Sequence, residues 1–239
     1  MYIPTPFLVE DRKVILAFMQ QFDFAAVVSH SDTAGLVASH VPVLIREVGS
    51  ELHIVGHVAR GNSHWRLMES QAESMVIFQG PHAYVSPTWY AASPAVPTWN
   101  YAVVHAYGAP RVREDATFIA GVVEDLTRRY EGQREHGWST EAVPAESYGK
   151  LLHAIVGFDI SVSRCEAKFK LGQNRSVEDR AGAITGLERE SSPMALELAK
   201  FSQPGDYVLQ VTANDFSGEG GSGEVCCWTT ALVKVTVTP

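Results

Sequence analysis

The chain has 239 residues, of which 46% are hydrophobic and 19% charged, and its formal net charge at pH 7 is −8. This length and composition are typical of a globular protein with one large domain, or with one domain and a small appendage. Because proteins that bind nucleic acids carry a basic face for the phosphates, the acidic balance argues against such a surface over the whole molecule.

The start of the chain does not have the pattern of a signal peptide. Glu10 and Asp11 stand where a basic segment would be expected, and no stretch reaches the roughly 18 apolar residues of a membrane helix. The three cysteines, Cys165, Cys226 and Cys227, do not have the pattern of a disulfide framework. We therefore expect a cytoplasmic protein that does not enter a membrane.

The first predicted elements are one helix, three strands and a second short helix. Residues 11–22 have apolar side chains at helical spacing, with Asp11 as N-cap. Residues 24–60 alternate like three strands, with breaks at the turn-rich segments SHSDTAG and EVGSE, so antiparallel hairpins are expected. A helix is predicted from about Ser63 to Ser70.

Longer elements follow in the second half of the chain. Residues 115–133 form a clear amphipathic pattern that Asp115 could cap. The other expected elements are strands over 73–87, 99–114 and 156–171 and helices over 145–155 and 177–191. Six or so strands with short turns and a few helices predict a mainly β fold with α, a barrel of mostly antiparallel strands decorated by helices.

The last forty residues have a different pattern. Residues 206–215 and 231–239 alternate strictly, and a loop rich in Gly and Ser lies between them. They look like the last two strands of an immunoglobulin-like sandwich. Because two strands alone rarely fold independently, this segment is either an extra hairpin on the main domain or a poorly ordered appendage.

The junction between a predicted strand and a predicted helix, at Arg60 to Trp65, is the first candidate site. The free N–H groups of a helix start, together with Arg60 and the Ser63 hydroxyl, would suit a phosphate. The plainer alternative is that Asn62 or Ser63 only caps the helix. Both interpretations remain open from the local pattern.

Histidines on the predicted strands offer a second set of candidates. His53 and His57 share one strand face, but no third ligand lies nearby, and no metal site is expected. His40, His82 and His105 lie in apolar strand segments, which is typical of hydrogen-bonded core or pocket residues.

Aromatic and basic segments complete the candidates. Residues 79–108 contain six Trp and Tyr residues and four prolines, and Trp89 and Trp99 fall in turns, which favours a pocket wall or a subunit interface. After the last long strand, Lys168 and Lys170 share a face, and Gln173 follows in a turn that is either solvated or binds a ligand. No catalytic triad, phosphate loop, dinucleotide fingerprint or cysteine-rich metal pattern is present, so catalytic residues stay unassigned.

Several of these segments together resemble one family. The motifs ASHVPVLI, GHVARGNSHW, VIFQGPHAYVSPTWY, VPTWNYAVVHAYG and AIVGFDISVSRCEAKFKLGQN are similar to those of the PaiB-type, FMN-binding negative transcriptional regulators. The resemblance covers about residues 1–190. It implies an FMN-binding split-barrel domain over 1–190. The residue patterns add a helical linker over 191–202 and a hairpin-like tail over 203–239, which does not fit the family.

The resemblance also implies a cofactor and an assembly. Similar proteins are usually homodimers with flavin at the subunit interface, and the turn ARGNS would hold the FMN phosphate. The resemblance and the residue patterns together predict the following cofactor-binding residues: Ser39, His40, Arg60, Asn62, Ser63, Trp65, Trp99, Asn100, Lys170 and Gln173. The family name implies repression of genes, with DNA or another regulator as partner. The alternatives are an FMN-dependent oxidoreductase of unknown substrate, a haem-binding split-barrel protein, or a dimeric scaffold with an emptied pocket.

Overall fold

The structure is a computed structural model, and it describes residues 1–33, 35–70, 72–203, 205–213 and 229–237. The chain divides into two compact units. Unit 1 comprises residues 1–22, 79–104 and 166–239, and unit 2 comprises residues 23–78 and 105–165. Three long strands therefore contribute residues to both units, and each unit is described by itself below.

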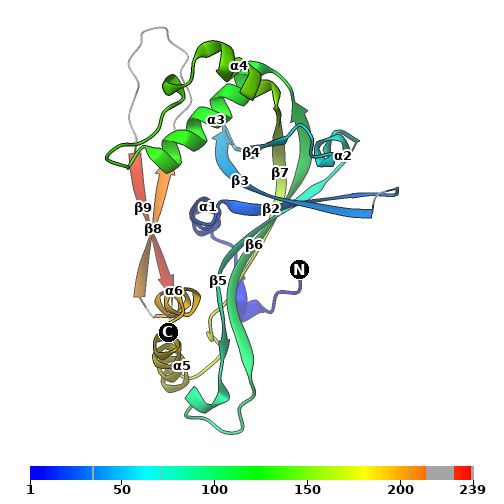
Figure 1. Cartoon of the computed structure of the whole chain (residues 1–239). Helices are drawn as coiled ribbons and strands as arrows, with labels where there is room; N and C mark the ends of the chain where they lie inside the picture. The colour runs from blue at the N-terminus through cyan, green and yellow to red at the C-terminus, as the bar shows by residue number, and fades with distance from the viewer. Residues whose placement is uncertain (34, 71, 204, 214–228, 238–239) are drawn as a thin grey trace. The chain divides into compact units, whose positions relative to one another are not determined.

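Helices and strands follow one another in the predicted order (Figure 1). Their ends agree with the prediction within about two residues. The helices are α1 (Arg12–Gln21), α2 (His64–Ser70), α3 (Ala116–Glu131), α4 (Ala145–His153), α5 (Val177–Glu190) and α6 (Pro193–Ser202), and the 3-10 turns are η1 (Thr5–Phe7), η2 (Pro87–Trp89) and η3 (Thr140–Ala142). The strands are β1 (Leu8–Val9), β2 (Phe24–Ser31), β3 (Gly35–Val48), β4 (Glu51–Ala59), β5 (Ser74–Val85), β6 (Thr98–Arg113), β7 (Ile155–Lys170), β8 (Gly205–Ala213) and β9 (Thr229–Val237). The two-residue strand β1 was not predicted.

Both predicted helix caps are confirmed. Asp11 accepts a hydrogen bond from the backbone N–H of Lys13 at 2.8 Å, and Asp115 accepts one from that of Phe118 at 2.9 Å. Each carboxylate satisfies a donor that has no partner within its own helix. These contacts explain why α1 and α3 begin where the sequence indicates.

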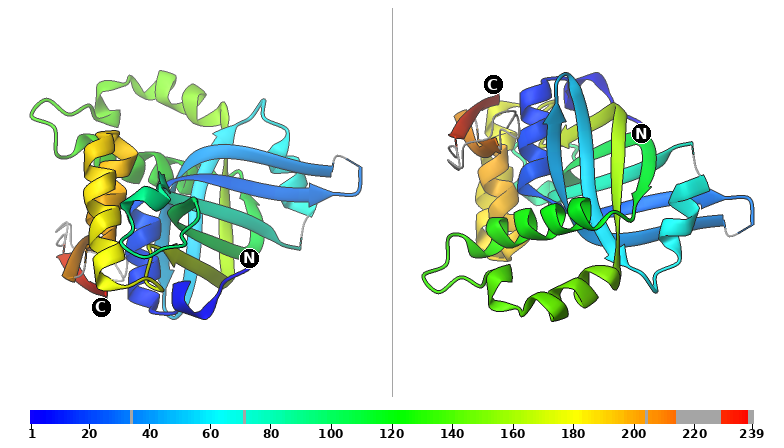
Figure 2. Two further views of the ribbon diagram at one scale, coloured as in Figure 1. Left: turned by 90° about the horizontal axis from the view of Figure 1, so that it is seen from below. Right: turned by 90° about the horizontal axis from the view of Figure 1, so that it is seen from above.

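Unit 2 is built on antiparallel pairing between neighbouring strands. The predicted hairpins are confirmed, because β2 pairs with β3 and β3 pairs with β4, while β4 also pairs with β7. Helix α3 covers β3 and β4 (Figure 2), and Val122 and Leu126 are buried against Leu44 and Val55. Burial of such side chains contributes roughly 1.5–3 kcal/mol each. On β2 and β3, Phe24 and Leu36 remain exposed.

Unit 1 has a core of phenylalanines whose rings pack at tilted and edge-on angles. Phe18 of α1 is fully buried, and its ring lies 4.9 Å from that of Phe169 and 6.5 Å from that of Phe201 in α6. Gly80 in β5 makes room for Phe18, since a Cβ at this position would lie 2.6 Å from the ring. Helix α6 therefore contributes Phe201 to the core of this unit.

The connection between β5 and β6 is held against helix α5, which lies beside α6 (Figure 2). Trp89 packs on a face of α5 that carries Gly182 and Gly186. A Cβ at Gly182 would lie 2.0 Å from the backbone oxygen of Trp89, and one at Gly186 would lie 2.1 Å from its ring. These two glycines are therefore required for the close approach of the connection.

The seven strands β1 to β7 form one sheet in the order β1-β7-β4-β3-β2-β5-β6, and β6 also pairs with β7. Strands β8 and β9 form a separate antiparallel hairpin. Most of the Gly/Ser-rich loop predicted between them, including Cys226 and Cys227, lies outside the described residues. In the described part of the chain, no helix is both long and apolar enough to span a membrane.

Candidate functional site

Unit 2 contains an open pocket of about 500 Å³ at one end of the β3–β4 pair. Its lining residues are Ala38, Ser39, His40, Val41, Pro42, His57, Val58, Ala59, Asn62 and Ile155. A pocket of this size, with mixed apolar and polar walls, is typical of sites for small molecules and cofactors. Three of the predicted cofactor-binding residues, Ser39, His40 and Asn62, lie in this lining.

The pocket begins where the β3–β4 ladder ends, and Pro42 explains that end. The last paired residues are Val43 and Gly56, so Pro42 would face His57 if the ladder continued. The N–H of Val43 donates to the oxygen of Asp23 at 2.9 Å, on the side of β2. Because backbone groups alternate sides along a strand, position 42 faces β4, where proline has no N–H to donate. The ladder therefore stops here, and β3 and β4 separate around the pocket.

A hydrogen-bonded cluster of three side chains lies at the edge of the pocket. The amide nitrogen of Asn62 donates to the hydroxyl oxygen of Ser39 at 2.9 Å, and Nδ1 of His64 lies 2.9 Å from the same oxygen. The amide oxygen of Asn62 accepts from the backbone N–H of His64 at 3.0 Å, so Asn62 caps α2. One of the two predicted caps is thus confirmed, and this cap also positions Ser39.

Two histidines of this region have a buried ring nitrogen with no hydrogen-bond partner among the described residues. These atoms are Nδ1 of His57, a residue that lines the pocket, and Nε2 of His64, whose side chain is fully buried. Burial lowers the pKa of both histidines, because the charged imidazolium loses its hydration. Both rings are therefore expected to be neutral at pH 7.

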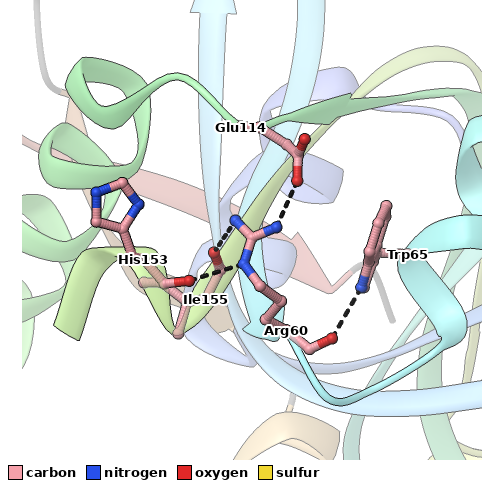
Figure 3. A network of polar contacts seen from close by, with 5 residues as sticks. All are labelled: Arg60, Trp65, Glu114, His153 and Ile155. Carbon is pink, nitrogen blue, oxygen red and sulfur yellow. Dashed lines mark hydrogen bonds and ion pairs between the residues drawn. The ribbon is translucent and has the colours of Figure 1, made fainter. Parts of the chain in front are cut away.

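Arg60, which was predicted to hold a phosphate, binds backbone oxygens at the junction of α4 and β7 (Figure 3). Its Nε donates to the oxygen of His153 at 2.7 Å, and Nη2 donates to that of Ile155 at 3.2 Å. Its Nη1 lies 2.5 Å from a carboxylate oxygen of Glu114. The charge also lies at the end of α4, where the helix dipole favours a cation.

The contacts of Arg60 use three of the five N–H groups of a guanidinium. The other two have no partner in the described part of the chain. Arg60 is thus bound in the structure and still has donors for a ligand, and its role towards a phosphate stays a prediction.

The other residues of the predicted turn are placed as follows. The indole N–H of Trp65 donates to the backbone oxygen of Arg60 at 3.1 Å, and the guanidinium of Arg66 lies 4.5 Å from a ring centroid of Trp65. Ser63 is exposed just before α2. Trp65 therefore stabilises the turn itself.

The remaining predicted residues, Trp99, Asn100, Lys170 and Gln173, lie in unit 1. Lys170 donates to the hydroxyl of Thr98 and, at 2.8 Å, to the backbone oxygen of Trp99. Gln173 accepts from the N–H of Leu171 at 2.8 Å and donates to the oxygen of Phe169 at 2.6 Å, so it closes the turn after β7. Asn100 is buried, and Trp99 is half exposed.

His53 and His57, which were considered as a pair of metal ligands, have separate contacts in the structure. Nδ1 of His53 lies 2.7 Å from a carboxylate oxygen of Asp159, and His57 lines the pocket. Across the residues that the structure describes, no group of three or more His, Cys, Asp or Glu side chains could hold a metal ion. The sequence did not indicate roles for His57 and His64 at this site, because only the spatial contact with the pocket and with Ser39 identifies them.

The comparisons with known proteins identify the family of the chain. Residues 1–164 match the family described as "Putative FMN-binding domain". The protease synthase and sporulation protein PAI 2 of Bacillus subtilis strain 168 is 35% identical over 203 residues, which cover 85% of this chain and 97% of that protein.

Two solved structures show the fold. The FAD and haem binding protein from Mycobacterium smegmatis covers 88% of this chain and 91% of its own, with a TM-score of 0.52 and 15% identity. The flavocytochrome Anf3 from Azotobacter vinelandii covers 73% of this chain and 75% of its own, with a TM-score of 0.52 and 16% identity. The predicted fold class, mostly antiparallel strands decorated by helices as in flavin-binding split-barrel proteins, is confirmed.

Proposed function

Because the chain belongs to the family described as "Putative FMN-binding domain", we propose that it binds FMN in the pocket of unit 2. The observation that carries the proposal is the pocket itself, which has polar atoms from β3, β4 and the start of α2. A flavin has an apolar ring system with hydrogen-bonding edges, and such a ligand suits walls of this mixed character.

The residues present fit such a group. His57 lines the pocket, and its Nδ1 is a buried polar atom without a partner in the described part of the chain. Buried polar groups normally have a hydrogen-bond partner, so this atom is consistent with a ligand that supplies one. Val41, Pro42 and Val58 provide apolar contact in the same lining.

We assign the following roles to the residues of the chain. Ser39, His40 and Asn62 bind polar edges of the cofactor, and His64 positions the Ser39 hydroxyl. Arg60 and Ser63 are the candidates for the phosphate, as the sequence predicts. A bound flavin would itself supply the capacity for hydride and electron transfer, so the protein needs only to bind it and control access.

We further propose that the protein is a homodimer. The face of β2 and β3 that carries Ala38 and His40 of the pocket also carries Phe24 and Leu36, which are 65% and 75% exposed. Apolar side chains gathered on one sheet face favour burial against a partner. A second copy on this face would cover one edge of the pocket. Sedimentation should then show a species of about 52 kDa, twice the 26.1 kDa of one chain, and Phe24→Glu should shift it to monomer.

The flavin proposal is tested by absorbance and by titration. Protein as purified should show bands near roughly 370 and 450 nm, as flavins do. Ala59→Trp should block binding, because Ala59 is an exposed pocket residue and a large ring there would fill the site. Ala109→Trp, at an exposed position of β6, is the matched control. Equal affinity of both variants for FMN would place the flavin elsewhere.

Three alternatives are separated by the same samples. Haem would replace the flavin bands by a Soret band, and the two histidines of the pocket, His40 and His57, are the candidate axial ligands. A flavin-dependent oxidoreductase would show reduction of its bound flavin by a nicotinamide cofactor. A regulator that binds DNA directly would bind a promoter fragment with strong salt dependence. A cytoplasmic location remains a prediction from the sequence.

A further inference from the structure

Two lysines near the end of β7 form an unusual cationic cluster in unit 1. Lys168 and Lys170 lie two positions apart on one strand and therefore share a face. Lys168 is only 7% exposed. Its ammonium donates to the backbone oxygen of Tyr2 at 3.1 Å and lies 5.2 Å from the ring centroid of Tyr101.

Neither lysine forms an ion pair with a carboxylate among the described residues. The nearby acidic side chains are otherwise engaged, since Glu166 pairs with the amino group of Met1 and Asp179 accepts from the N–H of Ala92 at 3.0 Å. Burial, with the positive charges of Lys168 and Arg175, lowers the pKa of Lys170. Like charges are thus concentrated here without matching negative charge.

Such an arrangement is unfavourable for folding alone. A buried ammonium without a counter-charge loses hydration and gains only one hydrogen bond to a neutral oxygen and contacts with ring faces. Arg175 adds a third cation, whose guanidinium lies 4.6 Å from the ring centroid of Tyr90. The cluster therefore attracts an anion that would supply the missing charge.

We infer that Lys168, Lys170 and Arg175 form a binding site for the phosphate or carboxylate group of a small aromatic molecule. The anion would accept hydrogen bonds from the lysines, which have donors to spare. The ring centroid of Tyr2, which is 84% exposed, lies 5.6 Å from the ammonium of Lys168 and provides ring surface for the aromatic part. Trp99, whose backbone oxygen binds Lys170, is 52% exposed and is the second candidate for that contact. This site does not depend on flavin binding.

The first test uses phenyl phosphate as the probe and the full chain, free of flavin and saturated with FMN. Calorimetric titration should show binding to both forms, weaker binding of inorganic phosphate and none of phenol. Lys168→Met should weaken phenyl phosphate at least tenfold, which corresponds to the loss of one charge-assisted hydrogen bond. Lys150→Met is the control, because Lys150 is exposed and pairs only with Glu146 on α4.

The second test is stability, and it separates a functional cation from a structural one. Met matches the length of the lysine stem and has no charge, so Lys168→Met should melt at the same temperature as the wild type or higher. Phenyl phosphate should raise the melting temperature of the wild type and leave that of the variant unchanged. A lower melting temperature of the variant, with no effect of the probe on the wild type, would overturn the proposal. Competition between FMN and phenyl phosphate would instead assign the cluster to the flavin site, as the sequence predicted for Lys170. That result would overturn the proposal that the cluster is a site of its own.

Discussion

Replacement of Arg60 by alanine tests two roles of one side chain. In the structure, the guanidinium binds the oxygens of His153 and Ile155, at 2.7 and 3.2 Å, and pairs with Glu114. The sequence predicts that the same residue binds the phosphate of FMN. Since two of its N–H groups have no partner among the described residues, we expect Arg60→Ala to affect both stability and flavin affinity.

The loss of stability follows from the contacts. A hydrogen bond from a charged group contributes roughly 1.5–3 kcal/mol, and the longer contact to Ile155 lies at the weak end of that range. The pair with Glu114 adds less than about 1 kcal/mol, because both side chains are more than a third exposed. Solvent also screens Arg60 itself, so the expected total is roughly 2–4 kcal/mol, or about 4–16 °C in melting temperature.

The loss of affinity is expected only for a ligand with a phosphate. Arg60→Ala should weaken FMN roughly 10- to 150-fold, as a charge-assisted contact of about 1.5–3 kcal/mol implies, and should leave riboflavin almost unchanged. The assay is a fluorescence titration of both flavins, with a melting curve of each protein to correct for the folded fraction. Glu114→Gln is the matched control, because it removes the negative charge beside Arg60 and keeps the two backbone contacts. It should change the melting temperature little and bind FMN at least as tightly as the wild type.

Two results would refute this reasoning separately. Unchanged FMN affinity per folded molecule would remove Arg60 from the flavin site and leave its structural role. An unchanged melting temperature would instead show that the backbone contacts at the end of α4 contribute little.

Three further predictions concern other parts of the molecule. Because the pKa values of His57 and His64 are lowered, the unfolded chain binds more protons than the folded chain below about pH 6.5. The free energy of unfolding, measured by chemical denaturation, should therefore decrease as the pH is lowered, by up to about 1.4 kcal/mol per pH unit for each histidine. A flat profile between pH 7 and 5 would contradict this. Gly182→Ala should destabilise by roughly 1–3 kcal/mol because its Cβ would meet a backbone oxygen at 2.0 Å, whereas Gly121→Ala, with open space in α3, should be neutral or stabilising in thermal melts. A chain ending at Gln203 keeps all of α6 and should melt within a few degrees of the full chain, and its failure to fold would make the last hairpin part of the core.

Much of the fold was predictable because it depends on local patterns. Alternation and helical spacing identified the strands and helices. Asp11 and Asp115 identified the starts of two helices, because a cap acts on residues close to it in sequence. The partners of Arg60 could not be found in this way. Glu114 and His153 are 54 and 93 residues away, and only the three-dimensional arrangement brings them together.

Only part of the candidate site could be predicted from the sequence. Ser39 and Asn62 were proposed from the sequence, and the structure joins them directly. His64 was overlooked, because its contact with Ser39 spans 25 residues and its position in the sequence suggests only a helix start. The contacts of Trp89 could not be predicted either. A tryptophan in a turn suggests a pocket wall, whereas Trp89 packs on two glycines of a helix.

The position of Pro42 has a consequence for the energetics of binding. The missing N–H is a covalent property of the chain, so no rearrangement of side chains can restore that hydrogen bond between β3 and β4. The opening is therefore present before any ligand arrives, and a ligand does not have to break a strand ladder to enter. A preorganised site of this kind loses little conformational entropy on association, so more of the contact energy is retained as affinity.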